Sequence, residues 1–229
     1  DVEDNSVAVA TFETVTQQLF IESEVIIQHY NESPLDFIVS DYAINYPFKY
    51  LANDNFILSS YMILPNEETR TLLNNWICNI YKYHEVIQTY TLLQKLTTYI
   101  FKNFTYKVRE EAGVQTAKQT LSYGSGSCRD FAFLFMEVVK CLGLATRFVS
   151  GYLYAPLMSD EVGSTHAWAE VYLPGGGWIG FDPTTGNIAG TDHISVAVSR
   201  LPDNVPPIAG SFLGVSDSTI SVGVWVTKV

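Results

Sequence analysis

Cys128 stands where a helix is predicted to begin. It follows the turn Gly124-Ser125-Gly126-Ser127 and precedes the nearly all-apolar run 131–139. A helix N-terminus carries partial positive charge and free backbone N–H groups, so it favours a thiolate over a thiol. The same N–H groups could stabilise the oxyanion that forms when the sulfur attacks a carbonyl. Because most free cysteines are simply small buried hydrophobes, it is this position that indicates a nucleophile.

The other two cysteines do not share that position. Cys141 lies 13 residues further along the same predicted helix, about 19 Å away at ~1.5 Å per residue, and no disulfide spans that distance. Cys78 falls within an earlier amphipathic helix, where we expect a core thiol. Three cysteines are in any case too few, and odd in number, for a disulfide framework.

A thiolate nucleophile needs a base, and the chain offers histidines at positions 29, 84, 166 and 193. His166 opens a strand of alternating pattern. If the following hairpin pairs Tyr172 with Trp178, His166 becomes the diagonal neighbour of Asp182 on one face, and their side chains can meet. Asp182 would then orient His166, and His166 would take the proton of Cys128. Considered alone, such a histidine is usually structural and an aspartate before proline is usually a turn residue.

Helices and strands are predicted around these residues in a segregated order. Two amphipathic helices, from about residue 67 to 80 and from 85 to 103, precede the helix that begins at Cys128. Ser127 and Asp130 can form a capping box for that third helix, and Gly143 ends it. Strands follow over 146–153, 166–173 and 178–182, and β texture continues over 194–198, 212–215 and 220–226. Helices first and strands afterwards indicate an α+β fold.

The N-terminal part has a different texture. Short apolar runs, among them Val25-Ile26-Ile27 and Phe56-Ile57-Leu58, alternate with turn-prone stretches between residues 7 and 64, which favours a small β-sandwich. We therefore predict two domains, a β-rich domain over residues 1–66 and a core over residues 67–229 that ends in a C-terminal β extension.

Charge and composition exclude several classes of partner. The 229 residues carry 13 Lys+Arg against 24 Asp+Glu, a net charge of −11, which argues against nucleic acid and against an anionic membrane surface. No apolar run approaches the roughly 20 residues of a membrane helix, and no signal-peptide pattern opens the chain. We favour the cytoplasm, although a chain that begins at Asp1 leaves the compartment open. The oligomeric state is open as well.

Four motifs in order are similar to the bacterial transglutaminase-like superfamily over about residues 85–185. They are Gly126-Ser127-Cys128-Arg129-Asp130-Phe131-Ala132, Arg147-Phe148-Val149-Ser150-Gly151-Tyr152, Thr165-His166-Ala167-Trp168-Ala169-Glu170-Val171-Tyr172 and Gly177-Trp178-Ile179-Gly180-Phe181-Asp182-Pro183-Thr184. The N-terminal β region also resembles the domain that often precedes this core, and the segment from His193 to Gly210 resembles the usual C-terminal extension. Arg129 departs from the family pattern, since many relatives carry Gln or another polar residue there.

The resemblance implies a papain-like, transglutaminase-like α+β core with Cys128, His166 and Asp182 as catalytic triad. It implies a cysteine-dependent enzyme that attacks a peptide or glutamine-type amide through a thioester. Hydrolysis, as a cysteine protease or amidase acting on a protein or peptide, is favoured over protein cross-linking, because the sequence lacks an Asp-rich calcium loop. A catalytically silent binding module is the alternative from another class.

No cofactor or metal is expected from the motifs. Cys78 and His84 do not make a zinc framework. The pair Gly124 and Gly126 lacks the further residues of a dinucleotide-binding or phosphate-binding loop.

Overall fold

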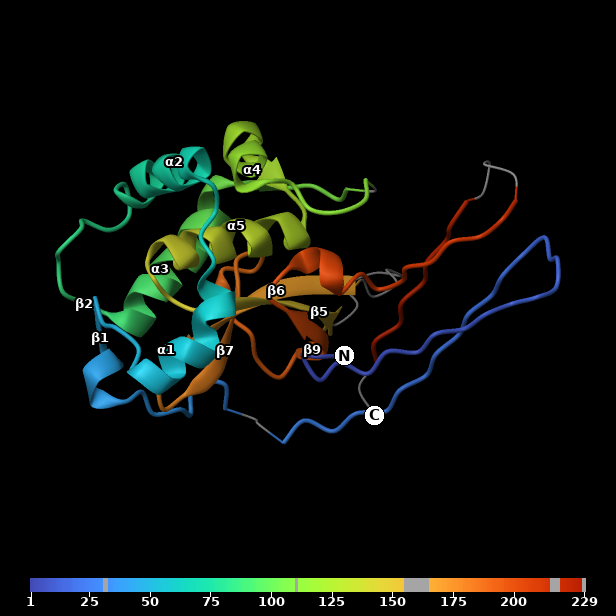
Figure 1. Cartoon of the computed structure of the whole chain (residues 1–229), viewed down its shortest axis with the longest axis horizontal. Coiled ribbons are helices and arrows are strands. Elements are labelled where there is room, and N and C mark those ends of the chain that lie inside the picture. Colours follow the sequence, from blue (N-terminus) through green and yellow to red (C-terminus); the bar gives the residue numbers. More distant parts are fainter. Residues whose placement is uncertain (31–32, 110, 155–164, 215–218, 228–229) are drawn as a thin grey trace.

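The computed structural model describes residues 1–30, 33–109, 111–154, 165–214 and 219–227. Figure 1 shows a group of helices packed on a twisted sheet, with the N-terminal and C-terminal segments reaching away from this body. The helices are α1 (Ala52–Leu58), α2 (Glu67–Ile77), α3 (Thr89–Asn103), α4 (Ala117–Tyr123) and α5 (Cys128–Cys141). The predicted α+β class is thus confirmed.

The main sheet has five antiparallel strands in the order β8-β7-β6-β5-β9. They are β5 (Thr146–Leu153), β6 (Thr165–Leu173), β7 (Gly177–Asp182), β8 (Asn187–Ile188) and β9 (His193–Ser199). Two short pairs lie apart from it: β1 (Asn45–Tyr46) with β2 (Ile87–Gln88), and β3 (Thr105–Tyr106) with β4 (Ser125–Gly126). The strands predicted over 146–153, 166–173, 178–182 and 194–198 are all found.

Helix α5 lies across β6 and β5 and supplies the centre of the core. Phe131 and Phe135 are almost fully buried, and the Phe135 ring stacks on Phe181 of β7 with centroids 5.7 Å apart. Burying one such aromatic side chain stabilises the fold by about 1.5–3 kcal/mol. The apolar faces of α2 and α3 close the same core through Leu73, Ile77, Leu92, Leu93, Leu96 and Ile100. The prediction that α5 is central is therefore confirmed.

The strands predicted in the N-terminal part are wrong in the described residues. No strand occurs in residues 1–30 or 33–44, where Val9, Val15 and Ile26 are largely exposed, and residues 52–58 form α1. β-branched residues favour strands when a paired, half-buried surface receives them, and these segments have no such surface in the structure. Short apolar runs such as 56–58 fit a helix as well as a strand. The small sandwich is therefore not seen.

Residues 41–62 instead pack against the core. The hydroxyl of Tyr46 donates to Leu142 O at 3.0 Å, and that of Tyr50 donates to Tyr172 O at 2.9 Å. The division of the chain into domains at residue 66 stays a prediction.

The other differences are local. Helix α3 begins at Thr89 because Ile87 and Gln88 pair with β1. Helix α4, with Thr116 and Gln119 as capping box, was not predicted. Residues 212–214 form no strand, and residues 220–226 have only an isolated bridge at Val224. In the described ranges, no helix has the length and apolar character needed to cross a membrane.

Candidate active site

Cys128 is the first residue of α5 and lies half-buried at its N-terminus. Ser127 is the N-cap, and the predicted capping box with Asp130 is present. The Ser127 backbone N–H and hydroxyl both donate to Asp130 Oδ2 at 2.8 Å. The first turn of the helix is therefore held rigidly, and with it the position of the thiol relative to the free backbone N–H groups of that turn.

The Asp130 carboxylate also ties a neighbouring loop to this turn. It is fully buried, and its Oδ1 accepts hydrogen bonds from Arg109 Nη1 and from the Gln115 backbone N–H, both at 2.7 Å. A Cβ atom at Gly126 would stand 2.8 Å from Asp130 Cβ. Glycine at position 126 is therefore what lets the carboxylate approach the turn.

We expect Asp130→Asn to lower the free energy of unfolding by about 2–4 kcal/mol, because an amide NH₂ would face N–H donors and Arg109 would lose its buried carboxylate partner. Urea unfolding measures the loss. The matched control is Asp41→Asn, at an exposed carboxylate in the first turn of a short 3₁₀ helix, which should stay within about 0.5 kcal/mol of the wild type. Equal effects of the two substitutions would contradict the role given to Asp130.

Tyr106 lies beside the nucleophile and was missed from the sequence. It pairs with Gly126 in the parallel β3–β4 ladder, and its ring meets Phe131 edge-on at 6.4 Å. Burial, and next the charge and hydrogen bonding of Cys128, raise the pKa of Tyr106. Its hydroxyl is therefore a neighbour of the thiol. A strand of two residues is too short for an alternating pattern to show.

His166 and Asp182 meet as the hairpin register predicts. Tyr172 stands opposite Trp178 and Ala169 opposite Phe181. His166 Nε2 lies 2.8 Å from Asp182 Oδ2. Both side chains are buried, that of Asp182 completely. The predicted contact between these two residues is therefore confirmed.

The carboxylate of Asp182 is saturated with donors. Its Oδ1 accepts the Thr184 backbone N–H at 2.8 Å. Its Oδ2 accepts His166 Nε2 at 2.8 Å, Thr185 Oγ1 at 3.0 Å and His193 Nε2 at 3.1 Å. A buried charge is tolerated when such partners satisfy it, so Asp182 can remain ionised at this depth.

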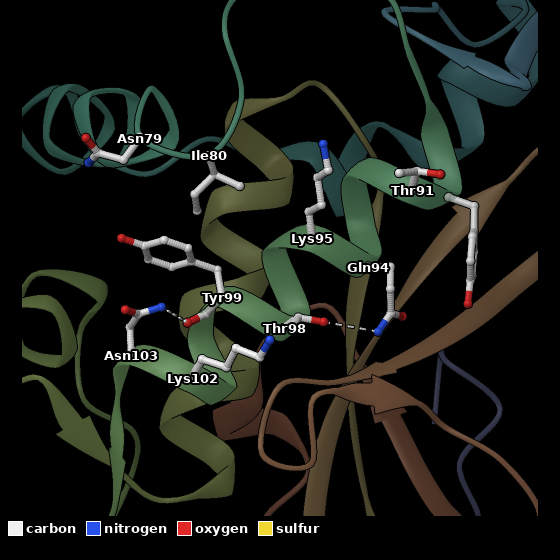
Figure 2. Close-up of a pocket in the computed structure, with 10 residues that line it drawn as sticks. Asn79, Ile80, Thr91, Gln94, Lys95, Thr98, Tyr99, Lys102 and Asn103 are labelled. Atoms are coloured by element: carbon white, nitrogen blue, oxygen red, sulfur yellow. Dashed lines mark hydrogen bonds between the residues drawn. The ribbon is translucent and has the colours of Figure 1, made fainter.

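Helix α3 fixes the turn that follows Asp182. The Gly186 N–H donates to Asp182 O at 2.9 Å, and Gly186 O accepts a hydrogen bond from Gln94 Nε2 at 2.9 Å. Gly186 has a φ of +77°, and a Cβ there would stand 2.8 Å from the Phe101 ring, so only glycine suits this position. Figure 2 shows Gln94 and Thr98 joined by a hydrogen bond on this face of α3.

The electrostatics favour a charged imidazole. Burial by itself lowers the pKa of His166, but hydrogen bonds to Asp182 and to Cys128, together with their charges, raise it to about 9. Burial likewise works to raise the pKa of Asp182, but hydrogen bonds from His166 and His193 hold it well below its usual range. At neutral pH the pair is therefore imidazolium and carboxylate.

This pair gives a pH dependence of stability. The pKa of His166 is raised from 6.5 to about 9, so its protonated form stabilises the folded state fully below about pH 6.5, and that stabilisation is lost as the pH rises through 9. We expect the free energy of unfolding to fall over this range in the wild type and to fall less in His166→Gln. The control His29→Gln removes an exposed imidazole and should keep the wild-type slope. Identical slopes for His166→Gln and the wild type would refute the raised pKa.

His193 joins the site although the sequence placed it only in the C-terminal extension. In the sheet β6 and β5 stand between β7, which carries Asp182, and β9, which His193 begins. Hairpin register therefore could not predict their contact. The ligand-type atoms of His166, Asp182 and His193 lie within 4.8 Å of one another. In the described part of the chain, this is the group that could hold a metal ion.

The remaining cysteines differ from Cys128. Cys141 is half-buried, and burial raises the pKa of its thiol to about 11. The prediction of a core position for Cys78 is wrong: α2 ends at Ile77, and Cys78 is its exposed C-cap.

Arg129 donates to the backbone carbonyls of Arg109 and Glu111, so its guanidinium is held by the neighbouring loop.

Solved structures support the fold. A "Putative Cysteine Protease" from Cytophaga hutchinsonii superposes with a TM-score of 0.55 at 21% identity, over 77% of this chain and 61% of that one. At this identity the likeness concerns the fold alone.

Curated relatives are mycobacterial. The uncharacterized protein ML0607 of Mycobacterium leprae is 36% identical over 109 residues, 45% of this chain and 38% of the relative. The uncharacterized protein Rv2569c of Mycobacterium tuberculosis is 31% identical over 138 residues, 56% of this chain and 44% of the relative. The chain thus spans less than half the length of the curated relatives it matches.

The segment that contains the site also matches a known family. Residues 82–183 match the core domain of the transglutaminase-like superfamily. This stretch holds α3, α5 and the strands β5, β6 and β7, and it includes Cys128, His166 and Asp182. The chain therefore contains, over residues 82–183, a domain that matches the transglutaminase-like superfamily.

Proposed function

We propose that the chain is a cysteine-dependent acyl-transfer enzyme that attacks a peptide or glutamine-type amide through Cys128 and transfers the acyl group mainly to water. One observation carries the proposal. The buried imidazole of His166 is hydrogen-bonded to Asp182, the nearby thiol of Cys128 helps to raise the pKa of that imidazole, and the thiol stands at the N-terminus of α5. A nucleophile, its base and the group that orients the base are then contiguous.

The reaction would proceed in two halves. The thiolate of Cys128 attacks the amide carbon, a C–S bond forms, and the carbonyl oxygen becomes an oxyanion beside the first N–H groups of α5. The C–N bond then breaks as His166 gives its proton to the leaving nitrogen, which leaves a thioester. Water attacks the thioester while His166 takes its proton, and the C–S bond breaks to release the carboxylic acid.

The groups around the triad support specific steps. Removal of one oxyanion donor from a serine protease lowers the rate about 10²–10³-fold, and here the capping box fixes the candidate donors in the first turn of α5. Asp182 stays ionised throughout and stabilises the imidazolium. Transfer to an amine would use the same thioester and differ only in the acceptor.

A panel of glutamine-containing peptides, incubated with and without a primary amine, tests this proposal. Ammonia or peptide release without incorporation of the amine is the expected result, and incorporation would identify a cross-linking transferase instead. The Cys128→Ser variant serves as control. Turnover of no amide, or equal turnover by the Cys128→Ser variant, would contradict the proposal and favour a binding module.

A further inference from the structure

We infer that His193 is a positioning residue of this site, which holds the carboxylate of Asp182 in the orientation that His166 requires. The inference rests on the proposed function of Cys128, His166 and Asp182, and it adds to the triad a fourth residue from a different strand. The contacts of the His193 ring with Gly190, Asp182 and Trp168 carry the inference.

The ring of His193 is held in one orientation. Its Nδ1 accepts a hydrogen bond from the Gly190 backbone N–H at 3.1 Å, and the His193 N–H donates back to Gly190 O at 3.0 Å. A ring nitrogen that accepts a hydrogen bond carries no proton, so the proton of the neutral ring is on Nε2. Nε2 is thus a donor, and it lies 3.1 Å from Asp182 Oδ2.

The contact is a buried one. The side chains of Asp182 and His193 are 0% and 9% exposed, so solvent does little to weaken the hydrogen bond between them. The Trp168 indole, itself buried, meets the His193 ring edge-on with centroids 5.1 Å apart, and it stacks beside His166 at 6.1 Å. One aromatic side chain therefore packs against both imidazoles.

The strands are shaped to bring His193 this close. β5 and β9 are irregular at Ser150 and Gly151, and a Cβ at Gly151 would stand 2.1 Å from Ile194 O and 3.0 Å from the Trp168 ring. Glycine at position 151 therefore lets the start of β9 lie against β5 and Trp168. In the described chain, the ionisable groups in contact with the His193 ring are Asp182 on β7 and His166 on β6, whose ring centroid is 5.8 Å away.

Three side chains share one oxygen of the Asp182 carboxylate. His193 and Thr185 both donate to Asp182 Oδ2, which leaves that oxygen a restricted direction in which to receive His166 Nε2. Without His193 the carboxylate loses a donor, binds a proton more readily and can rotate. The imidazolium of His166 would then form less readily, and Cys128 would react more slowly as a nucleophile.

The test compares His193→Leu with His193→Gln in the full chain, after dialysis against EDTA. Glutamine keeps an Nε2–H donor at similar reach but cannot titrate, whereas leucine keeps only bulk. The readout is the rate of Cys128 alkylation by iodoacetamide between pH 4 and pH 10, followed by peptide mass spectrometry, with thermal melts as a check of folding. This readout needs no knowledge of the substrate.

We expect His193→Leu to slow alkylation of Cys128 at pH 7 about tenfold, the effect of one hydrogen bond to a charged group, and to shift the acid limb of the pH profile upward. His193→Gln should recover to within about threefold of the wild type. A purely structural role would lower the melting temperature without moving the acid limb.

Two results would overturn the inference alone. One is a folded His193→Leu variant in which the pH profile of Cys128 alkylation is the same as in the wild type, while wild-type Cys128 reacts fast. The other is a His193→Gln variant as slow as His193→Leu. A wild-type Cys128 no faster than Cys78 would instead overturn the proposed function, and the inference with it.

Discussion

Replacement of Cys128 by serine is expected to lower kcat for amide turnover at least about a thousandfold. A serine hydroxyl at the start of α5 keeps the shape of the site but is a far weaker nucleophile beside an imidazole arranged to receive a thiol proton. Loss of a nucleophile typically leaves only the rate that substrate binding and the oxyanion donors provide. The measurement is product release from the peptide amides of the substrate panel, with the fold of the variant checked by its melting curve.

Cys78→Ser is the matched control for this substitution. Cys78 is the exposed C-cap of α2, outside the site, so the control should keep kcat within about twofold of the wild type. A Cys128→Ser variant that turns over amides at the control's rate would exclude the thioester route.

Asp182→Asn is expected to lower kcat/KM by about 10³–10⁴-fold, since the loss of the oriented carboxylate leaves the base in the wrong tautomer. The amide would present an NH₂ group to donors on His166, His193 and Thr185, of which His166 Nε2 lies at 2.8 Å. Without the carboxylate, burial would lower the pKa of His166 from its value of about 9. Rate measurements over a pH series, together with NMR titration of the imidazole, report both effects.

The matched control is Asp192→Asn. Asp192 is exposed and lies in the segment that leads from β7, which Asp182 ends, to β9. Its substitution should therefore change kcat/KM less than twofold. An Asp182→Asn variant that keeps more than a tenth of the wild-type kcat/KM and the raised pKa of His166 would show that Asp182 does not orient the base.

The parts of the site that could be predicted are those in which local pattern and burial agree. Helix α5 is nearly all apolar and has its own cap in Ser127 and Asp130, so its place and its start at Cys128 follow from the sequence. The β6–β7 hairpin is similar. Val171 of β6 stands opposite Ile179 of β7, and both are buried in the core, so a one-residue slip would move one of them to the other face, and the contact of His166 with Asp182 follows.

The parts that could not be predicted depend on tertiary neighbours. His193 reaches Asp182 across the end of the sheet, past two intervening strands, and no spacing encodes that approach. Tyr106 belongs to a parallel pair of two-residue strands. The N-terminal runs around Val9 and Ile26 carry β-branched residues but have no surface to pair with, so their propensity produced no strand.

The measurement that tests the central claim most directly is the rate of iodoacetamide labelling of the three cysteines in the native chain at neutral pH. Labelling of Cys128 at least about tenfold faster than that of exposed Cys78, with half-buried Cys141 slower still because burial raises the pKa of its thiol to about 11, is the expected result. Equal slow labelling of all three cysteines, or faster labelling of Cys78, would contradict an activated thiolate at Cys128.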